Sequence, residues 1–197
     1  MIKAVIFDIG GVLSEKGHIT PFAEVYASKF GKDVEEFTRI IIENWDKARV
    51  NEIKSSLFWE NLADYLKTSK EDLKKDYMDW VGFRADIFDL VKKLKKEYKL
   101  GLLSNHIEDW LGEIIKEKNF REIFDVIITS YGFKIAKPDI RIFKEMIKKL
   151  KLKPEECIYI DDLEKNIPPA KELGINTILF KNANQLKKDL EEFEIII

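Results

Sequence analysis

The sequence predicts an α/β fold, a doubly wound, Rossmann-like parallel sheet with a helical subdomain inserted into it. Three observations predict this fold. Five short runs are nearly continuously apolar, as expected of strands that helices cover on both faces. Amphipathic helical patterns lie between these runs, which favours parallel strands joined by crossover helices. Residues 15–82, after the first run, contain no strand-like run at all.

The strand-like runs are spread over most of the chain. In chain order they are residues 3–8, 99–104, 125–130, 157–162 and 176–180. Helices are expected where apolar residues recur at helical spacing. The expected helices are residues 85–98, 109–118, 139–150 and 165–173.

The interval from residue 15 to residue 82 is helical in pattern and rich in aromatic residues. It is too long for a loop within a compact domain, so we expect it to fold as a small helical subdomain. Most of its aromatic side chains are expected in the core of that subdomain. The chain thus divides into an α/β core domain, residues 1–14 and 83–197, and a helical subdomain, residues 15–82.

The composition narrows the classes of function. Lys and Arg number 34 and Asp and Glu number 36, and this balance gives no reason to expect nucleic acid or a membrane as partner. Cys157 is the single cysteine, so no disulfide forms within the chain. No apolar run approaches the roughly 18 residues of a membrane span, and we recognise no signal peptide. We therefore expect a cytoplasmic protein, either a monomer or a homodimer.

Polar residues follow four of the five expected strands. In an open parallel sheet ligands bind beyond the carboxyl ends of the strands, so these residues are expected to form one site. They are Asp8 after the first strand, Ser104, Asn105 and His106 after the second, Lys137 in the segment after the third, and Asp161 and Asp162 after the fourth.

The residue types at these strand ends suggest phosphoryl transfer. Three carboxylates in one cleft repel each other unless a cation lies among them, and oxygen ligands suit Mg²⁺. The hydroxyl of Ser104, the ammonium of Lys137 and the backbone amides around Gly10 and Gly11 can all donate to a phosphoryl group. A carboxylate beside both metal and phosphoryl group can attack phosphorus. The residues alone therefore suggest Mg²⁺-assisted phosphoryl transfer through Asp8.

The order and spacing of these residues resemble the four motifs of the haloacid dehalogenase superfamily. The matching segments are FDIGGVL at 7–13, LLSN at 102–105, KIAKPD at 134–139 and YIDDLEKN at 159–166. The insertion after the first motif resembles the helical cap of subfamily I members. Among these members, the chain is similar to small-metabolite (sugar-phosphate) phosphatases and to the N-terminal phosphatase domain of epoxide hydrolases.

The resemblance implies a role for each catalytic residue. Asp8 would be the nucleophile and a metal ligand, Ser104 would hold a phosphoryl oxygen, and Lys137 would steady nucleophile and phosphate. Gly10, Gly11 and Asn105 would contact the substrate. The implied reaction is Mg²⁺-dependent hydrolysis of a small phosphomonoester, such as a sugar phosphate, through an aspartyl-phosphate. The sequence does not identify which phosphomonoester is the substrate.

The metal ligands follow from the same resemblance. Asp8 and the Gly10 carbonyl would bind Mg²⁺ from the first motif. Asp162 would be the main ligand from the fourth motif, with Asp161 as an additional or outer ligand. Asn166 would support the lysine or the water molecules on the metal.

Gly10 departs from the family pattern, because most phosphatases of the family carry a second aspartate there as general acid and base. Losing such a group typically costs on the order of 10²–10⁴-fold in rate. Three interpretations stay open: a working phosphatase that uses another group, a 2-haloacid dehalogenase-like hydrolase, or a weakened phosphometabolite-binding module. Dehalogenases of this family usually have tyrosine at this position and lack the paired acids of the fourth motif. Gly10 and the pair Asp161-Asp162 therefore count against the dehalogenase interpretation.

Two side-chain pairs are secondary candidates. His106 and His18, the two histidines of the chain, could replace the missing proton carrier, since an unperturbed imidazole titrates near 6.5. His106 is preferred because Ser104 is so close in sequence. Arg49 and Lys54 in the inserted segment could meet an anionic substrate. The competing interpretation for all four is an ordinary surface residue.

Overall fold

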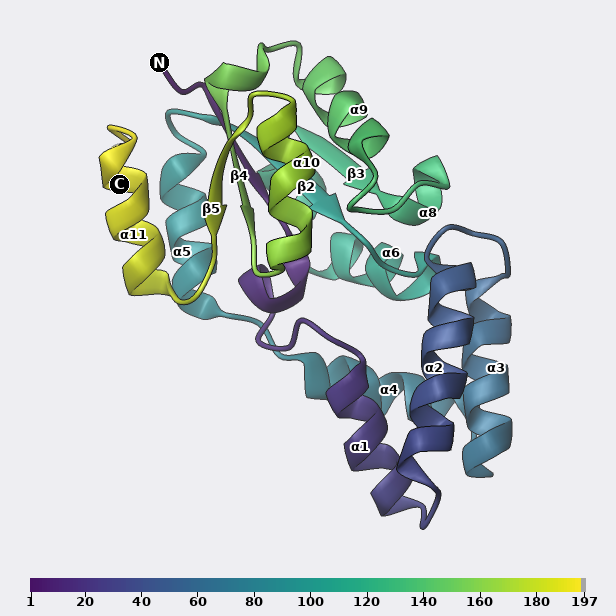
Figure 1. The fold of residues 1–197 in the computed structure, drawn as a ribbon. Helices are drawn as coiled ribbons and strands as arrows, with labels where there is room; N and C mark the ends of the chain where they lie inside the picture. The colour runs from purple at the N-terminus through teal and green to yellow at the C-terminus, as the bar shows by residue number, and fades with distance from the viewer. Residues whose placement is uncertain (196–197) are drawn as a thin grey trace.

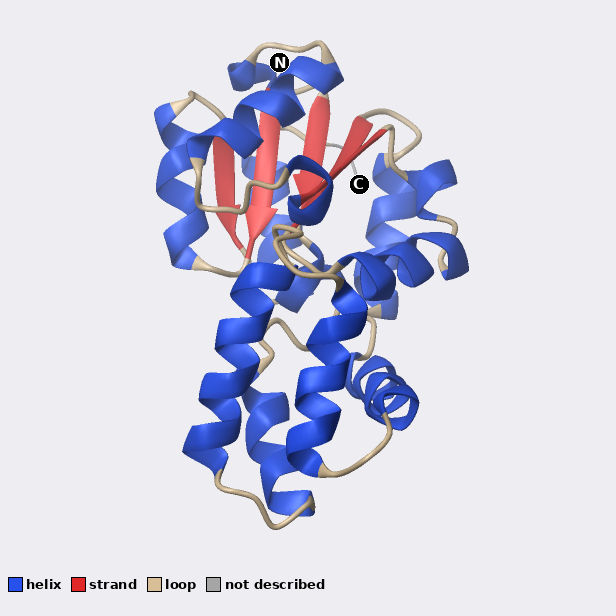
Figure 2. Ribbon diagram, turned by 90° about the vertical axis from the view of Figure 1, so that its right-hand side faces the viewer, coloured by secondary structure: helices blue, strands red, loops and turns tan. Residues whose placement is uncertain are grey.

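The computed structural model describes residues 1–195 and confirms the α/β fold. A single parallel sheet has the strand order β3-β2-β1-β4-β5, with helices on both of its faces (Figure 2). Each strand lies within one of the expected apolar runs. The strands are β1 (Ala4–Phe7), β2 (Lys99–Ser104), β3 (Val126–Thr129), β4 (Cys157–Asp161) and β5 (Asn176–Leu179).

The alternation of side chains along β1 explains why the strands are apolar throughout. Val5 and Phe7 are buried in one hydrophobic cluster and Ala4 and Ile6 in another, because successive residues of a strand face opposite sides of the sheet. Helices α5 (Ala85–Leu94) and α11 (Ala183–Glu192) contribute to the first cluster. Helices α9 (Ile140–Leu150) and α10 (Ile167–Glu172) contribute to the second and lie on the other side of the sheet in Figure 1.

Short elements complete the core around the sheet. Helix α6 (Glu108–Glu117) follows β2 at the sheet's carboxyl edge. The expected helices are confirmed, with ends that differ by a few residues. The remaining elements are the turn η1 (Ile9–Leu13), helices α7 (Phe120–Ile123) and α8 (Ser130–Phe133), and the 3₁₀ turns η2 (Pro154–Glu156) and η3 (Glu164–Asn166).

The interval between residues 15 and 82 folds into the helices α1 (Thr20–Lys29), α2 (Val34–Ala48), α3 (Ser55–Leu66) and α4 (Lys70–Val81). Side-chain caps start two of them, because Asp33 accepts from Glu36 N at 2.7 Å and Ser69 accepts from Asp72 N at 3.0 Å. Figure 1 shows these four helices beyond the carboxyl ends of the strands. They therefore lie on the side of the sheet where the candidate site residues gather.

The two chain segments that join these helices to the rest of the molecule run side by side. Ser14 and Phe83 form an isolated antiparallel bridge, and Arg84 N donates to Leu13 O at 2.9 Å. The division into domains at these positions stays a prediction, and residues 196–197 of the expected core domain lie outside the described residues. Within residues 1–195, no helix is long and apolar enough to cross a membrane.

Gly101 marks a point of close packing in β2. An added Cβ would lie 3.0 Å from Met146 Sδ and 3.1 Å from Ile6 Cγ1. Gly101→Ala is therefore expected to lower the free energy of unfolding by about 1–3 kcal/mol through overpacking. Gly112→Ala is the matched control in α6, where a Cβ meets nothing within 4 Å, and it should raise that free energy by about 0.5–1 kcal/mol. Urea unfolding measures both, and equal shifts would contradict the packing argument.

Candidate active site

Three carboxylates meet at the carboxyl edge of the sheet. The register of the sheet places Phe7 of β1 opposite Ile160 of β4, so Asp8 and Asp161 follow at the same level. With Asp162, they form a group of three acids whose ligand oxygens all lie within 4.8 Å of one another. Asp8 and Asp161 are buried and Asp162 is half-buried. The parallel strands thus bring together acids that are more than 150 positions apart in the sequence.

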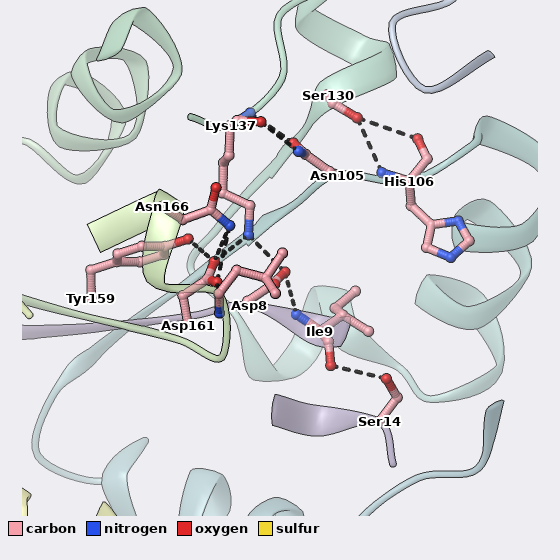
Figure 3. A network of polar contacts seen from close by, with 11 residues as sticks. Asp8, Ile9, Ser14, Asn105, His106, Ser130, Lys137, Tyr159, Asp161 and Asn166 are labelled. Atoms are coloured by element: carbon pink, nitrogen blue, oxygen red, sulfur yellow. Dashed lines mark hydrogen bonds and ion pairs between the residues drawn. The ribbon is translucent and has the colours of Figure 1, made fainter. Parts of the chain in front are cut away.

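Lys137 joins two of these acids through its buried ammonium. Its Nζ lies 2.9 Å from Asp8 Oδ1 and 2.7 Å from Asp161 Oδ2, and its side chain is 2% exposed. Asn105 fixes the backbone of Lys137 from both sides (Figure 3). Asn105 Oδ1 accepts from Lys137 N and Asn105 Nδ2 donates to Lys137 O, each at 2.9 Å. The end of β2 therefore holds the lysine in position.

The carboxylate of Asp161 is fully occupied by hydrogen bonds. Besides Lys137, it accepts from Leu163 N at 2.8 Å, from Asn166 Nδ2 at 3.0 Å and from the hydroxyl of Tyr159. Burial by itself would raise the pKa of Asp161, but the Lys137 ammonium and these donors hold it below its usual value. Asp161 is thus an ionised anchor for Lys137.

Asp8 has one oxygen engaged and one free. Oδ1 accepts from Ile9 N at 2.7 Å and pairs with Lys137, while no described residue donates to Oδ2. Burial raises the pKa of Asp8 to about 8, with Asp161 and Asp162 adding to that effect and Lys137 opposing it. Burial and the neighbouring Asp161 also raise the pKa of Asp162. Without a cation the native state therefore favours a protonated Asp8, because three ionised carboxylates would exceed the single charge of Lys137.

This donor set fits a hard divalent cation. Only oxygen ligands are present in the cluster, and Mg²⁺ is bound through one or two carboxylates with water and phosphate oxygens completing the octahedron. Asp8 Oδ2 and the half-buried Asp162 have oxygens available, whereas those of Asp161 are already taken. Burial first, and then the neighbouring acids, raise the pKa values of Asp8 and Asp162, and a cation beside these carboxylates would oppose both effects.

Glycines let the backbone approach these acids closely. Gly11 has φ +68°, and a Cβ there would overlap the Asp162 carboxylate. A Cβ on Gly17 would lie 2.6 Å from Asp162 Oδ2, and one on Gly10 would lie 3.0 Å from Gly17 O. The segment after η1 therefore folds back over the turn. It occupies the space that the side chain of an acid at position 10 would enter.

A cavity of about 350 Å³ opens between the sheet edge and helices α1, α2 and α4. Four of the eight residues predicted to act as catalytic groups, substrate contacts or metal ligands line it, namely Asp8, Gly10, Asn105 and Lys137. The lining does not include four others, namely Gly11, Ser104, Asp161 and Asp162. Ser104 is 1% exposed at the end of β2, and its contact with a phosphoryl oxygen stays a prediction.

The two histidines differ in their surroundings. His106 stacks on Trp110 with ring centroids 3.7 Å apart, and burial lowers its pKa to about 3. Its ring points away from Asp8 and Lys137 in Figure 3. A histidine that stays neutral in this way is a poor proton carrier, so the preference for His106 loses its support. Both histidines line the cavity, but His18 is exposed and His106 is buried, which favours His18 as the proton carrier.

Other contributors to the site were missed or misjudged in the sequence. Residues 42, 45, 46 and 49 line the cavity from one face of α2, and their i, i+3, i+4, i+7 spacing was a usable signal. Arg49 is among them, whereas Lys54 is exposed and is not. Tyr159 donates to Asp161 from the same face of β4. Because side chains two residues apart in a strand lie on the same face, the sequence could have indicated this contact.

Comparison with known proteins matches the chain to one family and to several phosphatases. The family profile "Haloacid dehalogenase-like hydrolase" covers residues 5–180. The chain is 26% identical over 214 residues to D-ribitol-5-phosphate phosphatase of Bacteroides thetaiotaomicron, covering 96% of this chain and 97% of that protein. It is 35% identical over 97 residues to glyceraldehyde 3-phosphate phosphatase of Methanocaldococcus jannaschii, covering 49% of this chain and only 42% of that protein.

A solved structure resembles the whole fold. It is a HAD family enzyme of Bacteroides thetaiotaomicron in complex with magnesium and inorganic phosphate. The two structures share a TM-score of 0.77 and 26% identity, over 92% of this chain and 95% of the other. That enzyme binds both ligands that the residues at the sheet edge of this chain suit.

Gly11→Ala tests the contact between the glycine turn and Asp162. The added methyl group overlaps the Asp162 carboxylate, so we expect Mg²⁺ affinity to fall by about tenfold or more if this carboxylate binds the ion. Gly31→Ala is the control, because Gly31 has a similar φ of +62° with nothing within 4 Å of an added Cβ. Isothermal titration with Mg²⁺ measures both variants. Equal affinity in the two would show that the turn does not position Asp162.

Asp8→Asn tests the charge imbalance of the cluster. In EDTA the wild-type free energy of unfolding should fall as the pH rises from about 4 to about 8, because the native state retains a proton on Asp8 that the unfolded chain releases. Above this window Asp8→Asn should melt higher than the wild type, by roughly 2–4 °C for each kcal/mol gained. Thermal unfolding across the pH range, repeated with Mg²⁺, makes the measurement. A variant that melts lower throughout would contradict the argument.

Proposed function

Because the chain belongs to the haloacid dehalogenase-like hydrolase family, we propose that it is a Mg²⁺-dependent phosphatase of small phosphomonoesters. One observation carries the proposal. Asp8 lines the cavity with Oδ1 fixed by Ile9 N and Lys137 Nζ and with Oδ2 unengaged. This is the arrangement that a carboxylate nucleophile requires, with one oxygen held and the other free to attack.

The reaction in this proposal has two steps. In the first, Asp8 Oδ2 attacks phosphorus, the bond between phosphorus and the ester oxygen breaks, and the leaving alkoxide takes up a proton. In the second, a water molecule attacks phosphorus, gives up a proton, and the bond from phosphorus to Asp8 breaks. The products are an alcohol, inorganic phosphate and the restored carboxylate. Lys137 stabilises the charge that develops on the phosphoryl oxygens in both steps.

Mg²⁺ would be held by Asp8, Asp162 and the Gly10 carbonyl, and when bound it neutralises the phosphoryl oxygens and the acids around them. Asp161 acts differently in this proposal. Its oxygens are occupied by Lys137, Tyr159, Leu163 and Asn166, so it orients the lysine instead of binding the metal directly. Ser104 and the amides of the glycine turn would donate to the phosphoryl group.

Gly10 leaves the proton transfers to another group. His18 lines the cavity and follows Gly17, the residue whose backbone fills the space beside Gly10. In this proposal His18, or water admitted beside it, exchanges protons with the leaving group. Such a carrier is less well fixed than a buried carboxylate. We therefore expect turnover at the low end of the family's range, consistent with a loss of about 10²-fold or more.

The helices α1–α4 form the cap of the active site in this proposal. The cap would comprise residues 15–82 and the core domain residues 1–14 and 83–197. Residues of α2 line the cavity opposite Asp8 and Lys137, so the leaving group would contact the cap. Closing the cap over the sheet edge excludes bulk water from the aspartyl-phosphate.

Phosphate release from a panel of sugar, nucleotide and triose phosphates tests this function. We expect turnover with Mg²⁺, none in EDTA, and a loss on the order of 10³-fold or more in Asp8→Asn, which lacks the nucleophile. Asp79→Asn makes the same change at a side chain that is 70% exposed and should retain full activity. Halide release from a 2-haloacid without Mg²⁺ would favour a dehalogenase instead. Folded protein that binds Mg²⁺ yet releases no phosphate would favour a binding module.

A further inference from the structure

Helix α3, one of the inserted helices, completes the N-terminus of α6 in the sheet domain. Asp109 lies in the first turn of α6, where backbone N–H groups have no partner within the helix. Ile107, which precedes the helix, has an apolar side chain that cannot accept a hydrogen bond. Ser55, the first residue of α3, accepts from Asp109 N at 3.3 Å instead. The start of α6 is thus bonded to a side chain of the inserted segment.

Lys74 joins a second inserted helix to α6. It lies on α4, and its Nζ is 2.6 Å from Glu113 Oε1 and 3.4 Å from Asp109 Oδ2, both on α6. Trp59 Nε1 of α3 also donates to Asp109 Oδ1, at 3.3 Å. Burial lowers the pKa of Lys74, but the two carboxylates outweigh burial and hold it above its usual value. Lys74 therefore stays charged while its side chain is only 22% exposed.

These polar contacts adjoin one wall of the cavity. Tyr77 lies three residues after Lys74, on the same side of α4, and Trp110 follows Asp109 on α6. Tyr77 and Trp110 both line the cavity, and their ring centroids are 5.9 Å apart. Part of the wall is thus a seam between α4 and α6. The seam is here the set of contacts that Ser55, Trp59, Lys74 and Tyr77 make with Asp109, Trp110 and Glu113.

The chain connections lie at the other end of α4 from Lys74. There residues 13–16 and 81–84 run side by side, with Glu15 N donating to Gly82 O at 3.3 Å and Lys16 N to Val81 O at 3.1 Å. Hinge motions are absorbed by a few residues at the ends of elements, such as these. The seam therefore holds α4 against α6 at a distance from the point where α4 could turn.

We propose that the seam is a latch, in which Lys74 holds the inserted helices against α6 and the cavity opens when its ion pairs with Asp109 and Glu113 break. The opening turns α4 about the connecting segments and separates Tyr77 from Trp110 while the sheet stays folded. The inference goes beyond the proposed reaction and stands whether or not the chain hydrolyses phosphomonoesters. In that reaction, the latch would govern the entry of substrate and the release of product.

Thiol labelling at the seam tests the latch. Ser55→Cys places a thiol of similar size at a seam residue that is 9% exposed, and Cys157 in β4, which is 0% exposed, reports unfolding of the sheet. A bulky aromatic reagent such as dithiobis-nitrobenzoate reaches such thiols only when the structure around them opens. We expect the thiol at position 55 to react at least about tenfold faster than Cys157, because local opening costs less than global unfolding. Equal rates would show that the helices leave α6 only when the chain unfolds, and would overturn the inference.

Lys74→Ala in the same background assigns the latch to its residue. Loss of the charged hydrogen bonds should raise the labelling rate at position 55 by about tenfold or more. Lys75→Ala is the matched control, since it removes a 76% exposed lysine from the same helix, and it should leave the rate unchanged. Adding Asp109→Asn and Glu113→Gln to Lys74→Ala should change the rate by less than about twofold, because the ion pairs are already broken. An unchanged rate in Lys74→Ala, an equal rise in Lys75→Ala or a larger further rise in the combined variant would overturn the inference.

Discussion

The ion pairs of Lys137 with Asp8 and Asp161 are the interaction on which the rest of the site depends. They require β1 and β4 to be neighbours in register, so that two acids reach one edge of the sheet together. They also require the amide of Asn105 to hold the lysine backbone. Buried ion pairs add little net stability because desolvation offsets attraction. Their contribution here is to fix one oxygen of Asp8 and leave the other free.

The same arrangement leaves the site short of positive charge. One ammonium faces three acids, and burial together with the neighbouring Asp161 and Asp162 raises the pKa of Asp8. Tyr159 and Asn166 donate hydrogen bonds to Asp161 without adding charge. With its oxygens occupied in this way, Asp161 is less available to a cation than Asp8 and Asp162. These carboxylate oxygens suit a divalent cation, whose charge would balance the acids that Lys137 alone does not.

Much of this could be predicted from local sequence. Buried strands are apolar over their whole length, and the polar residue that ends a run marks the carboxyl edge, which predicted that Asp8 and Asp161 lie at that edge. Lys137 was predicted from the segment that follows the third run. Contacts between segments that are distant in the sequence could not be predicted from these local patterns. The approach of Gly17 to Gly10, the packing of His106 on Trp110 and the exposure of Lys54 all follow from how the inserted helices fold against the edge. The helical spacing of residues 42, 45, 46 and 49 shows a shared face, but not which neighbour that face meets.

The absence of an acid at position 10 has a physical consequence for the whole molecule. The backbone of Gly17 lies where that acid would project, and the segment that contains Gly17 is the one that leads from the core into α1. A Cβ at position 10 would lie 3.0 Å from Gly17 O, so any side chain there would require this segment to shift slightly. Glycine lets the segment pack against the turn without that shift. The chain has glycine at this position, so the proposed reaction assigns the proton transfers to His18, which lies in this segment, or to solvent.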